Sequence, residues 1–294
     1  MVPEEEKRMV ISLDMQEMNR IKWIDFENNL ACIEAGAVGC DIDNKLKEHG
    51  LCLGHEPDSY EFSTLGGWIS TRASGMKKNV YGNIEDFVVR IKFVTPIGTI
   101  DCKVNAERKS TGPDLHELIL GHEGTLGVVT EAVCRVHKLP EGKKKIIIEL
   151  KKIVQKWGSV VFPDFETGVA CVNEISNKKL APASIRLMDN LMFLFGQALK
   201  VKSDSKIEQF IDWLKKIYLT KFCGFDLNKV TVCTLLFEGD KDMVELQEKK
   251  LYEICAKYGG VKAGSDAGKQ GYLLTYVIAY LRDYAMAVSF FLNL

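Results

Sequence analysis

Residues 55–75 read HEPDSYEFSTLGGWISTRASG, and this is one of two stretches that stand out in the first half of the chain. It is dense in serine, threonine and glycine, and it lacks the apolar periodicity of a helix or a strand. Glycine allows a backbone to approach a ligand closely, and successive exposed N–H groups form a concavity that suits an anion. The stretch therefore favours a binding loop for a diphosphate or for the electron-rich edge of a flavin.

A second glycine-rich stretch, residues 121–130, reads GHEGTLGVVT. Its glycines recur every three residues and lead into a valine-rich strand, which suits a tight turn against a planar ligand. Either stretch alone could equally be a glycine-rich turn with a purely structural role. The two together favour a ligand site. No GxGxxG follows a strand and opens a helix, and no Walker motif occurs, so a nucleotide site here belongs to another fold.

The composition is that of an ordinary globular chain without a dominant charge. Its 294 residues are 46% hydrophobic and carry a net charge of -1, which allows a sizeable core and two domains. A general nucleic-acid or membrane partner is not indicated, because the chain lacks the excess of basic residues that usually marks such proteins. The nine cysteines contain no CxxC pair, so we interpret them as free thiols and expect no metal site.

The expected secondary structure divides the chain into residues 1–140 and 141–294. Apolar patterning in the first part predicts strands at 9–13, 29–34, 87–94, 99–102 and 126–136 and helices at 41–49 and 115–120. In the second part it predicts strands at 158–162, 184–188 and 230–237 that alternate with helices at 165–178, 205–218 and 242–258. This order predicts an α+β domain, a sheet covered by helices.

Both glycine-rich stretches resemble the FAD-binding domain of the vanillyl-alcohol-oxidase (VAO) type of flavoprotein. Residues 57–59, 63–68 and 73–75 carry one part of the resemblance. Residues 121–127 match the superfamily's Gly-Ser-Glu-Gly-Thr-Leu-Gly motif, with His122 in place of the serine. Residues 54–59, 71–79, 181–190 and 271–280 resemble the alkyldihydroxyacetonephosphate synthases more narrowly, and the resemblance extends from about Pro3 to about Ala285.

The resemblance implies a fold and a function. The fold is α+β: part of a VAO/PCMH-type FAD-binding domain followed by part of an α+β substrate (cap) domain. The cofactor is FAD, and the activity is that of an alkylglycerone-phosphate synthase, a transferase of ether-lipid biosynthesis. Such enzymes replace the acyl chain of acyl-dihydroxyacetone phosphate with a long-chain fatty alcohol, without net redox change. The family is peroxisomal, and the full-length enzyme is compatible with a homodimer and with peripheral membrane association.

The resemblance also implies site residues, although none of them is assigned as catalytic. Arg282 is expected to hold the substrate phosphate with its planar fork, and Arg186 to support the flavin site. From the residues alone, ion pairs with Asp283 and Asp189 explain these arginines as well. His122 is expected to be a replaced small residue on a turn, not a base. FAD contacts are implied for Asp58, Ser59, Tyr60, Glu61, Phe62, Ser63, Thr64, Thr71, Arg72, Ala73, Ser74, Glu123, Gly124, Thr125, Leu126, Gly127, Val128 and Val129.

The sequence lacks several parts of the family pattern. The upstream diphosphate loop and targeting signal, and the downstream catalytic tyrosine and run of three histidines, do not occur in these 294 residues. We therefore expect an internal fragment that binds FAD weakly and lacks the full catalytic machinery. Two other functions stay open: a non-catalytic truncated product that acts only as an interaction protein, and a FAD-dependent 2-hydroxy-acid dehydrogenase. Residues 181–190 and 271–280 argue against the dehydrogenase.

Overall fold

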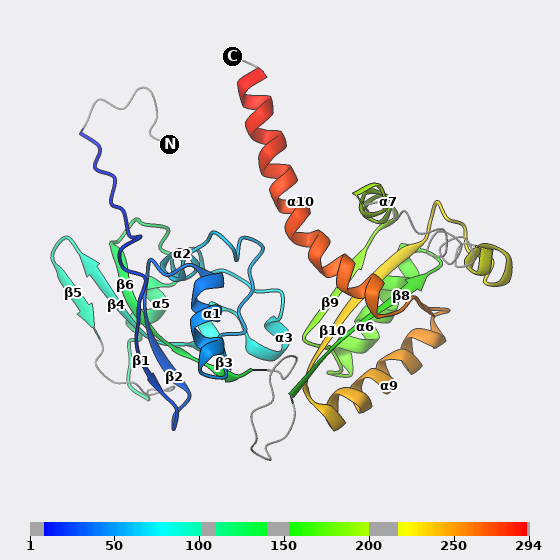
Figure 1. Ribbon diagram of the computed structural model, residues 1–294, viewed down its shortest axis with the longest axis horizontal. Coiled ribbons are helices and arrows are strands. Elements are labelled where there is room, and N and C mark those ends of the chain that lie inside the picture. The colour runs from blue at the N-terminus through cyan, green and yellow to red at the C-terminus, as the bar shows by residue number, and fades with distance from the viewer. Residues whose placement is uncertain (1–8, 102–109, 140–152, 200–216, 293–294) are drawn as a thin grey trace. The chain divides into compact units, whose positions relative to one another are not determined.

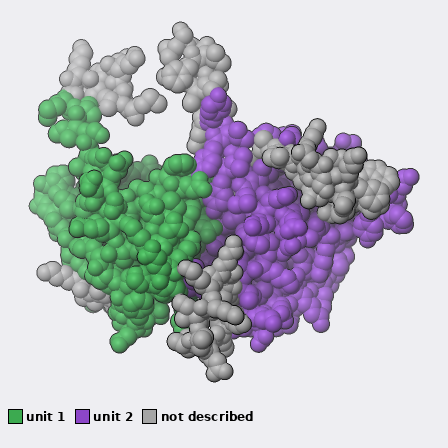
Figure 2. All heavy atoms as spheres, viewed as in Figure 1, with its two compact units in different colours: residues 1–75, 82–138 green, residues 76–81, 139–294 purple. Residues whose placement is uncertain are grey.

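The chain forms two compact units (Figure 2). The computed structural model describes residues 9–101, 110–139, 153–199 and 217–292. Unit 1 comprises the chain up to residue 75 together with residues 82–138, and unit 2 comprises residues 76–81 and the chain from residue 139 onward. The division near residue 139 lies where the composition changes, but the assignment of residues 76–81 to unit 2 follows only from the structure.

Unit 1 is built on a five-stranded antiparallel sheet with the strand order β1-β2-β6-β4-β5 (Figure 1). The sequence of β4 alternates as expected: Ile91 and Phe93 are buried, whereas Arg90 and Lys92 are half-buried. A strand with this period places one set of side chains on the core face of the sheet. The buried face packs against apolar side chains of α1 and α2 in one hydrophobic cluster, which includes Trp68.

The elements of unit 1 are β1 (Ile21–Asp25), β2 (Leu30–Glu34), α1 (Gly39–Glu48), β3 (Leu51–Cys52), α2 (Leu65–Thr71), α4 (Ile84–Phe87), β4 (Val88–Thr95), β5 (Gly98–Asp101), α5 (Leu115–Ile119), β6 (Val128–Arg135) and β7 (His137–Lys138). The two short strands β3 and β7 pair with each other in a separate sheet.

Unit 2 is a four-stranded antiparallel sheet with the order β11-β8-β10-β9, covered by helices on both faces (Figure 1). Strand β10 has eight consecutive buried residues, because both of its faces are covered. Leu235 and Phe237 pack in a cluster with residues of α6 and α9. Leu236, which points to the opposite face, packs with Tyr272 of α10.

The elements of unit 2 are α3 (Lys78–Tyr81), β8 (Ile153–Phe162), α6 (Phe165–Asn177), β9 (Ser184–Met188), α7 (Asn190–Leu199), the π-helix η1 (Tyr218–Phe222), β10 (Thr231–Asp240), α9 (Lys241–Lys257), β11 (Val261–Lys262) and α10 (Ser265–Leu292).

A buried polar network holds α3 within unit 2. The Lys77 ammonium lies 3.1 Å from a carboxylate oxygen of Glu238 on β10, and both side chains are almost fully buried. The phenol of Tyr81 donates to the other oxygen of the same carboxylate, and Gln155 donates at 3.2 Å to the oxygen that Lys77 contacts. A buried charge is costly unless it is paired and hydrogen-bonded, and Glu238 is both. This network explains why residues 76–81 pack with the second unit.

Most of the predicted elements are confirmed within one to five residues, including the β4–β5 hairpin and the end of α1 before Gly50, whose φ is +71°. Two predictions are wrong. Residues 9–13 form no strand, because no described strand pairs with that apolar run. Residues 65–71 are a helix, although the first glycine-rich stretch lacks helical periodicity. The helix expected at 205–218 lies mainly outside the described residues.

The antiparallel sheets and separate helices confirm the predicted α+β class. No helix within the described ranges is long and apolar enough to cross a membrane, and no group of metal-ligating side chains gathers there. The cysteines within the described ranges are free thiols, as expected.

Gly268 provides a test of how α10 packs on the sheet. A Cβ at this position would lie 2.2 Å from the carbonyl oxygen of Gly158 on β8, so the helix and strand backbones meet directly. We expect Gly268→Ala to destabilise unit 2 by about 1–3 kcal/mol, although alanine favours a helix by roughly 1 kcal/mol. Urea unfolding followed by circular dichroism measures the change. The neighbouring exposed Lys269→Ala is the control, and equal stability of the two variants would contradict the packing.

Candidate functional site

The first glycine-rich stretch forms a loop that leads into the short helix α2. Thr64 caps this helix, since its side-chain oxygen accepts the Gly67 N–H at 3.3 Å. The indole N–H of the buried Trp68 donates to the Ser63 hydroxyl at 2.6 Å and so anchors the loop to the core. Gly66 packs tightly on the neighbouring chain, because a Cβ there would lie 3.0 Å from the Ala35 carbonyl oxygen. The same density of small residues that hides helical periodicity allows α2 to lie close to the sheet.

A buried carboxylate anchors the loop before α2. Asp43 on α1 accepts the Leu53 N–H at 3.1 Å and the Tyr60 hydroxyl at 2.9 Å. Burial raises the pKa of the Asp43 carboxyl, and these two bonds offset part of that rise. The pKa of the Tyr60 phenol is raised by burial and by the nearby carboxylate, so the hydroxyl remains a donor. The neighbouring expected contact residues are exposed on the loop: Asp58, Ser59, Glu61 and Phe62.

Helix α2 ends in a Schellman motif with an unusual residue in it. The Ala73 N–H donates to the Trp68 carbonyl at 2.9 Å and the Arg72 N–H to the Ile69 carbonyl at 3.3 Å. Arg72 itself adopts the left-handed conformation, with φ at 51°, where glycine is the usual choice. The loop then turns at Ser74, whose hydroxyl donates to the Asn83 side chain at 2.7 Å.

The second glycine-rich stretch docks directly on this helix end. The Gly121 N–H donates to the Ile69 carbonyl at 3.0 Å, and the Glu123 N–H donates to the Ser70 carbonyl at 2.9 Å. The last carbonyls of a helix have no partner within it, so the incoming turn satisfies groups that would otherwise need water. The structure therefore brings the two stretches together within unit 1.

His122 lies at the centre of this contact. Its ring is 7% exposed, packs edge-on against Phe93, and lies with Nε2 at 3.2 Å from the Ser70 hydroxyl. Its Nδ1 accepts the Gly124 N–H at 2.9 Å. Burial lowers the pKa of His122, which favours the neutral ring. The sequence predicted that His122 is only a replaced small residue on a turn. The structure shows that its ring makes two specific hydrogen bonds. The only sequence signal for them was the histidine in place of the motif's serine.

Two strained backbone positions lie where the stretches meet. Four non-glycine residues in the described ranges have positive φ, and two of them, Arg72 and Glu123, belong to the expected FAD contacts. A left-handed conformation costs a non-glycine residue roughly 1–2 kcal/mol. Such outliers cluster at ligand sites, where the surrounding structure holds them in place. The strain therefore supports a binding role for this junction.

The residues at the junction fit FAD. Gly124 has φ of +79° and nothing within 4 Å of the position of a Cβ, so a planar ligand can approach its backbone. The hydroxyls of Thr71 and Thr125 donate to backbone carbonyls at 2.9 and 2.6 Å, which leaves their oxygens free to accept. Acceptor oxygens beside an open backbone suit the polar parts of a flavin that can donate, namely its ring N–H and its ribityl hydroxyls. Whether each expected residue contacts FAD stays a prediction.

Packing against the sheet constrains the residues at the start of β6, whether or not a ligand binds there. A Cβ on Gly127 would lie 2.2 Å from the Val94 carbonyl oxygen, so packing alone requires glycine there. Val129 is buried in the core cluster. A cofactor contact at Gly127 or Val129 would therefore involve the backbone. Val128 is only partly buried and pairs with Val94.

The two arginines expected near substrate lie in unit 2. Arg186 is in β9, opposite Thr234 of β10, and is partly buried. Arg282 lies on α10, and its side chain is outside the description. Their relation to the glycine-rich junction of unit 1 stays a prediction.

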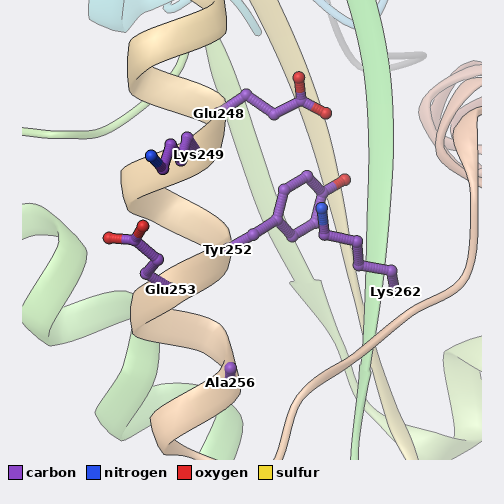
Figure 3. A pocket seen from close by; sticks show the side chains of 6 residues that line it. All are labelled: Glu248, Lys249, Tyr252, Glu253, Ala256 and Lys262. Atoms are coloured by element: carbon purple, nitrogen blue, oxygen red, sulfur yellow. The ribbon is translucent and has the colours of Figure 1, made fainter.

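Two depressions in the described part of the chain are lined by none of the expected residues. One, of about 410 Å³, is lined by charged residues of α9, by Tyr252 and by Lys262 of β11 (Figure 3). The Lys262 ammonium lies 3.7 Å from the centre of the Tyr252 ring, a cation–π contact. Acidic and basic groups alternate in this depression, so it favours no single class of ligand.

A histidine that the sequence did not single out is buried behind α2. His55 is 1% exposed and lies between the rings of Trp68 and Phe87, and neither ring nitrogen has a hydrogen-bond partner within the described structure. Burial lowers the pKa of His55 to about 4, and the nearby Glu56 carboxylate opposes this only in part. His55 is therefore a neutral core residue rather than a ligand-binding group.

Comparison with known proteins agrees with this geometry. The profile of the FAD binding domain matches residues 2–103, and that of the C-terminal domain of FAD linked oxidases matches residues 151–291. The alkyldihydroxyacetonephosphate synthase of Caenorhabditis elegans is 47% identical over 97% of this chain and 46% of its own length. That of Dictyostelium discoideum is 34% identical over 97% of this chain and 44% of its own. A solved alkyldihydroxyacetonephosphate synthase superposes with a TM-score of 0.81 at 33% identity, over 96% of this chain and 48% of that one.

The chain thus belongs to the family of FAD linked oxidases, whose cofactor is FAD. Within that family it is a homologue of the alkyldihydroxyacetonephosphate synthases. It spans about half the length of the curated relatives it matches. The glycolate oxidase subunit of Bacillus subtilis is also similar, but at 30% identity over 82% of the chain.

The buried His55 predicts a pH dependence of stability. Its folded pKa of about 4 is below the ordinary value of 6.5, so the unfolded chain binds the extra proton and stability is lost as pH falls between these values. We expect the folded state to lose about 2 kcal/mol between pH 7 and pH 5 from this group alone. Urea unfolding at the two pH values measures the loss.

The variant His55→Leu should reduce that loss and cost little at pH 7, because the ring makes no hydrogen bonds that leucine would remove. The exposed His49→Leu is the control and should retain the full loss. The same pH dependence in all three proteins would exclude His55 as its source.

Proposed function

We propose that unit 1 binds FAD at the junction between the end of α2 and residues 121–129. We further propose that the protein takes part in the exchange reaction of alkyldihydroxyacetonephosphate synthases, with acyl-dihydroxyacetone phosphate and a long-chain fatty alcohol as substrates. The observation that carries the proposal is the docking of the Gly121 and Glu123 N–H groups on the last carbonyls of α2. This contact joins the two stretches that resemble a FAD cradle and leaves the backbone of Gly124 open.

The chain's own residues would act by positioning. The left-handed Arg72 and Glu123 direct the turns, and the hydroxyls of Thr71 and Thr125 present acceptor oxygens beside the open Gly124 backbone. FAD supplies an isoalloxazine ring, which the family uses for ether-bond formation without net redox change. In unit 2, Arg282 would hold the substrate phosphate, since a guanidinium pairs bidentately with phosphate oxygens.

Two alternatives receive less support. A FAD-dependent 2-hydroxy-acid dehydrogenase is not favoured, because the synthases match at higher identity and over more of the chain than the glycolate oxidase subunit does. A non-catalytic role as an interaction protein would be consistent with a chain that corresponds to about half of its relatives. Activity measurements distinguish it from the synthase.

Family resemblance alone supports three further proposals about the whole protein. These are a peroxisomal location, assembly as a homodimer, and peripheral association with the membrane. Co-localisation of a tagged full-length protein with a peroxisomal marker tests the first, and a diffuse distribution would reject it.

The FAD site predicts a specific effect of filling the space beside Gly124. Asparagine tolerates a left-handed φ better than other side chains, so Gly124→Asn adds bulk with little strain. We expect this variant to raise the Kd for FAD at least tenfold, because its side chain occupies the path of the cofactor. Quenching of flavin fluorescence on titration measures the Kd.

A matched control is Gly50→Asn. Gly50 also has a left-handed φ, +71°, and nothing within 4 Å of a Cβ, but it lies after α1 outside the expected site. It should leave the Kd unchanged. Equal effects of the two substitutions would contradict the placement of FAD, and a native chain without any FAD affinity would reject FAD binding itself.

Synthase activity is tested by incorporation of a labelled fatty alcohol into dihydroxyacetone phosphate, measured with the full-length protein loaded with FAD. We expect incorporation that depends on acyl-dihydroxyacetone phosphate and falls at least tenfold in Arg282→Ala, because the phosphate would lose its bidentate partner. Oxidation of lactate or glycolate with a dye acceptor, without incorporation of alcohol, would instead support the dehydrogenase.

A further inference from the structure

We propose that His122 is a positioning residue for the cofactor: it links α2 to the Gly121–Gly124 turn through a relay of three hydrogen bonds and thereby fixes the backbone that would face FAD. The inference rests on the proposed FAD site. It concerns the position at which this chain departs from the superfamily's Gly-Ser-Glu-Gly-Thr-Leu-Gly motif, where histidine replaces serine.

The direction of each hydrogen bond in the relay follows from its neighbours. Nδ1 of His122 accepts the Gly124 N–H, so this nitrogen carries no proton. The Ser70 hydroxyl donates to the Gly66 carbonyl at 2.7 Å, so its oxygen must accept from the ring. Nε2 of His122 is therefore the protonated nitrogen and donates to Ser70. One neutral tautomer satisfies every member of the relay.

The relay joins the two ends of the proposed site. Gly66 lies in the first turn of α2, Ser70 in its last turn, and Gly124 in the opposite stretch. The Phe93 ring, which packs against His122, also lies 3.0 Å from the position of a Cβ on Gly127. The imidazole thus bonds directly to Gly124 at the end of the turn, and the Phe93 ring beside it packs near the entry into β6.

The charged groups close to the relay lie at its rim. The flanking Glu123 is exposed, and Arg72 pairs with Glu117 at 3.3 Å and with Glu85 at 3.8 Å. The ring itself is surrounded by the Ser70 hydroxyl, the Phe93 ring and the backbone of the turn. A serine side chain is too short to reach both Ser70 and the Gly124 N–H as the imidazole does, so histidine rigidifies the turn in a way that the usual residue does not.

The test uses substitutions that separate the two bonds of the ring. Asparagine places an acceptor where Nδ1 is and retains the bond from Gly124, whereas alanine removes both bonds. We expect His122→Ala to raise the Kd for FAD about tenfold and His122→Asn to recover at least part of that loss. Amide hydrogen exchange of residues 123–125, measured without FAD, should accelerate in His122→Ala and less in His122→Asn. The exposed His49→Ala is the matched control and should change neither quantity.

A double-mutant cycle with Ser70→Ala tests the relay itself. If His122 acts through Ser70, the double variant should bind FAD no more than about twofold worse than His122→Ala alone, because the relay is already broken. Fully multiplicative effects on the Kd would overturn the relay. So would a Kd and an amide exchange pattern of His122→Ala equal to those of the native chain.

The two proposals fail in different ways. If the native chain does not bind FAD, the proposed function fails, and amide exchange at residues 123–125 still decides whether His122 holds the turn. If the native chain binds FAD and only the thermal stability of His122→Ala changes, His122 is a structural residue and the positioning role is wrong.

Discussion

The free carbonyl groups at the end of helix α2 are the constraint on which the candidate site depends. A helix of seven residues leaves most of its carbonyls without partners inside the helix. The Trp68 and Ile69 carbonyls accept from the chain that follows, and the Ile69 and Ser70 carbonyls accept from the Gly121 and Glu123 N–H groups. A segment that is about 50 residues away in the chain is thereby held against α2, and the strained conformations of the junction follow from that contact.

The glycines of the two stretches have different physical roles. Gly127 is required by the close approach of the Val94 backbone and would be needed without any ligand, and Gly66 allows α2 to pack tightly on the Ala35 backbone. Gly124 has open space beside it and a left-handed φ. Glycines in close contact, such as Gly127, allow α2 and β6 to pack into the core. A glycine with open space beside it, such as Gly124, leaves its backbone accessible. A FAD site needs both, since a rigid framework must present an open edge.

Unit 2 depends on a different balance. Its central strand β10 is apolar over most of its length and is covered on both faces, yet it ends near a buried carboxylate, Glu238. Lys77, Tyr81 and Gln155 together satisfy this carboxylate. Removal of one partner would leave a buried charge uncompensated, which costs more than the pair contributes. Residues 76–81 are thus held in unit 2 by this ion pair and its hydrogen bonds, together with the hydrogen bond from Asn79 to the Pro182 carbonyl and the packing of Met76.

Local pattern by itself determined much of this protein. Three elements were predicted from their own residues: β4 by its period-two alternation, the end of α1 by the glycine that follows it, and α9 by its apolar spacing. Such elements bury one face, and the order of neighbouring residues shows which face that is. The spacing of glycines in the two motifs favoured a ligand site, and the resemblance of these motifs to those of the FAD-binding superfamily indicated the family. The tertiary structure alone decided the helical state of residues 65–71, the absence of a strand at residues 9–13 and the docking of the second motif on α2. It also decided the tautomer of His122. Each of these depends on a hydrogen-bond partner, or on the lack of one, far away in the chain, and no local pattern encodes which distant group will satisfy a buried carbonyl.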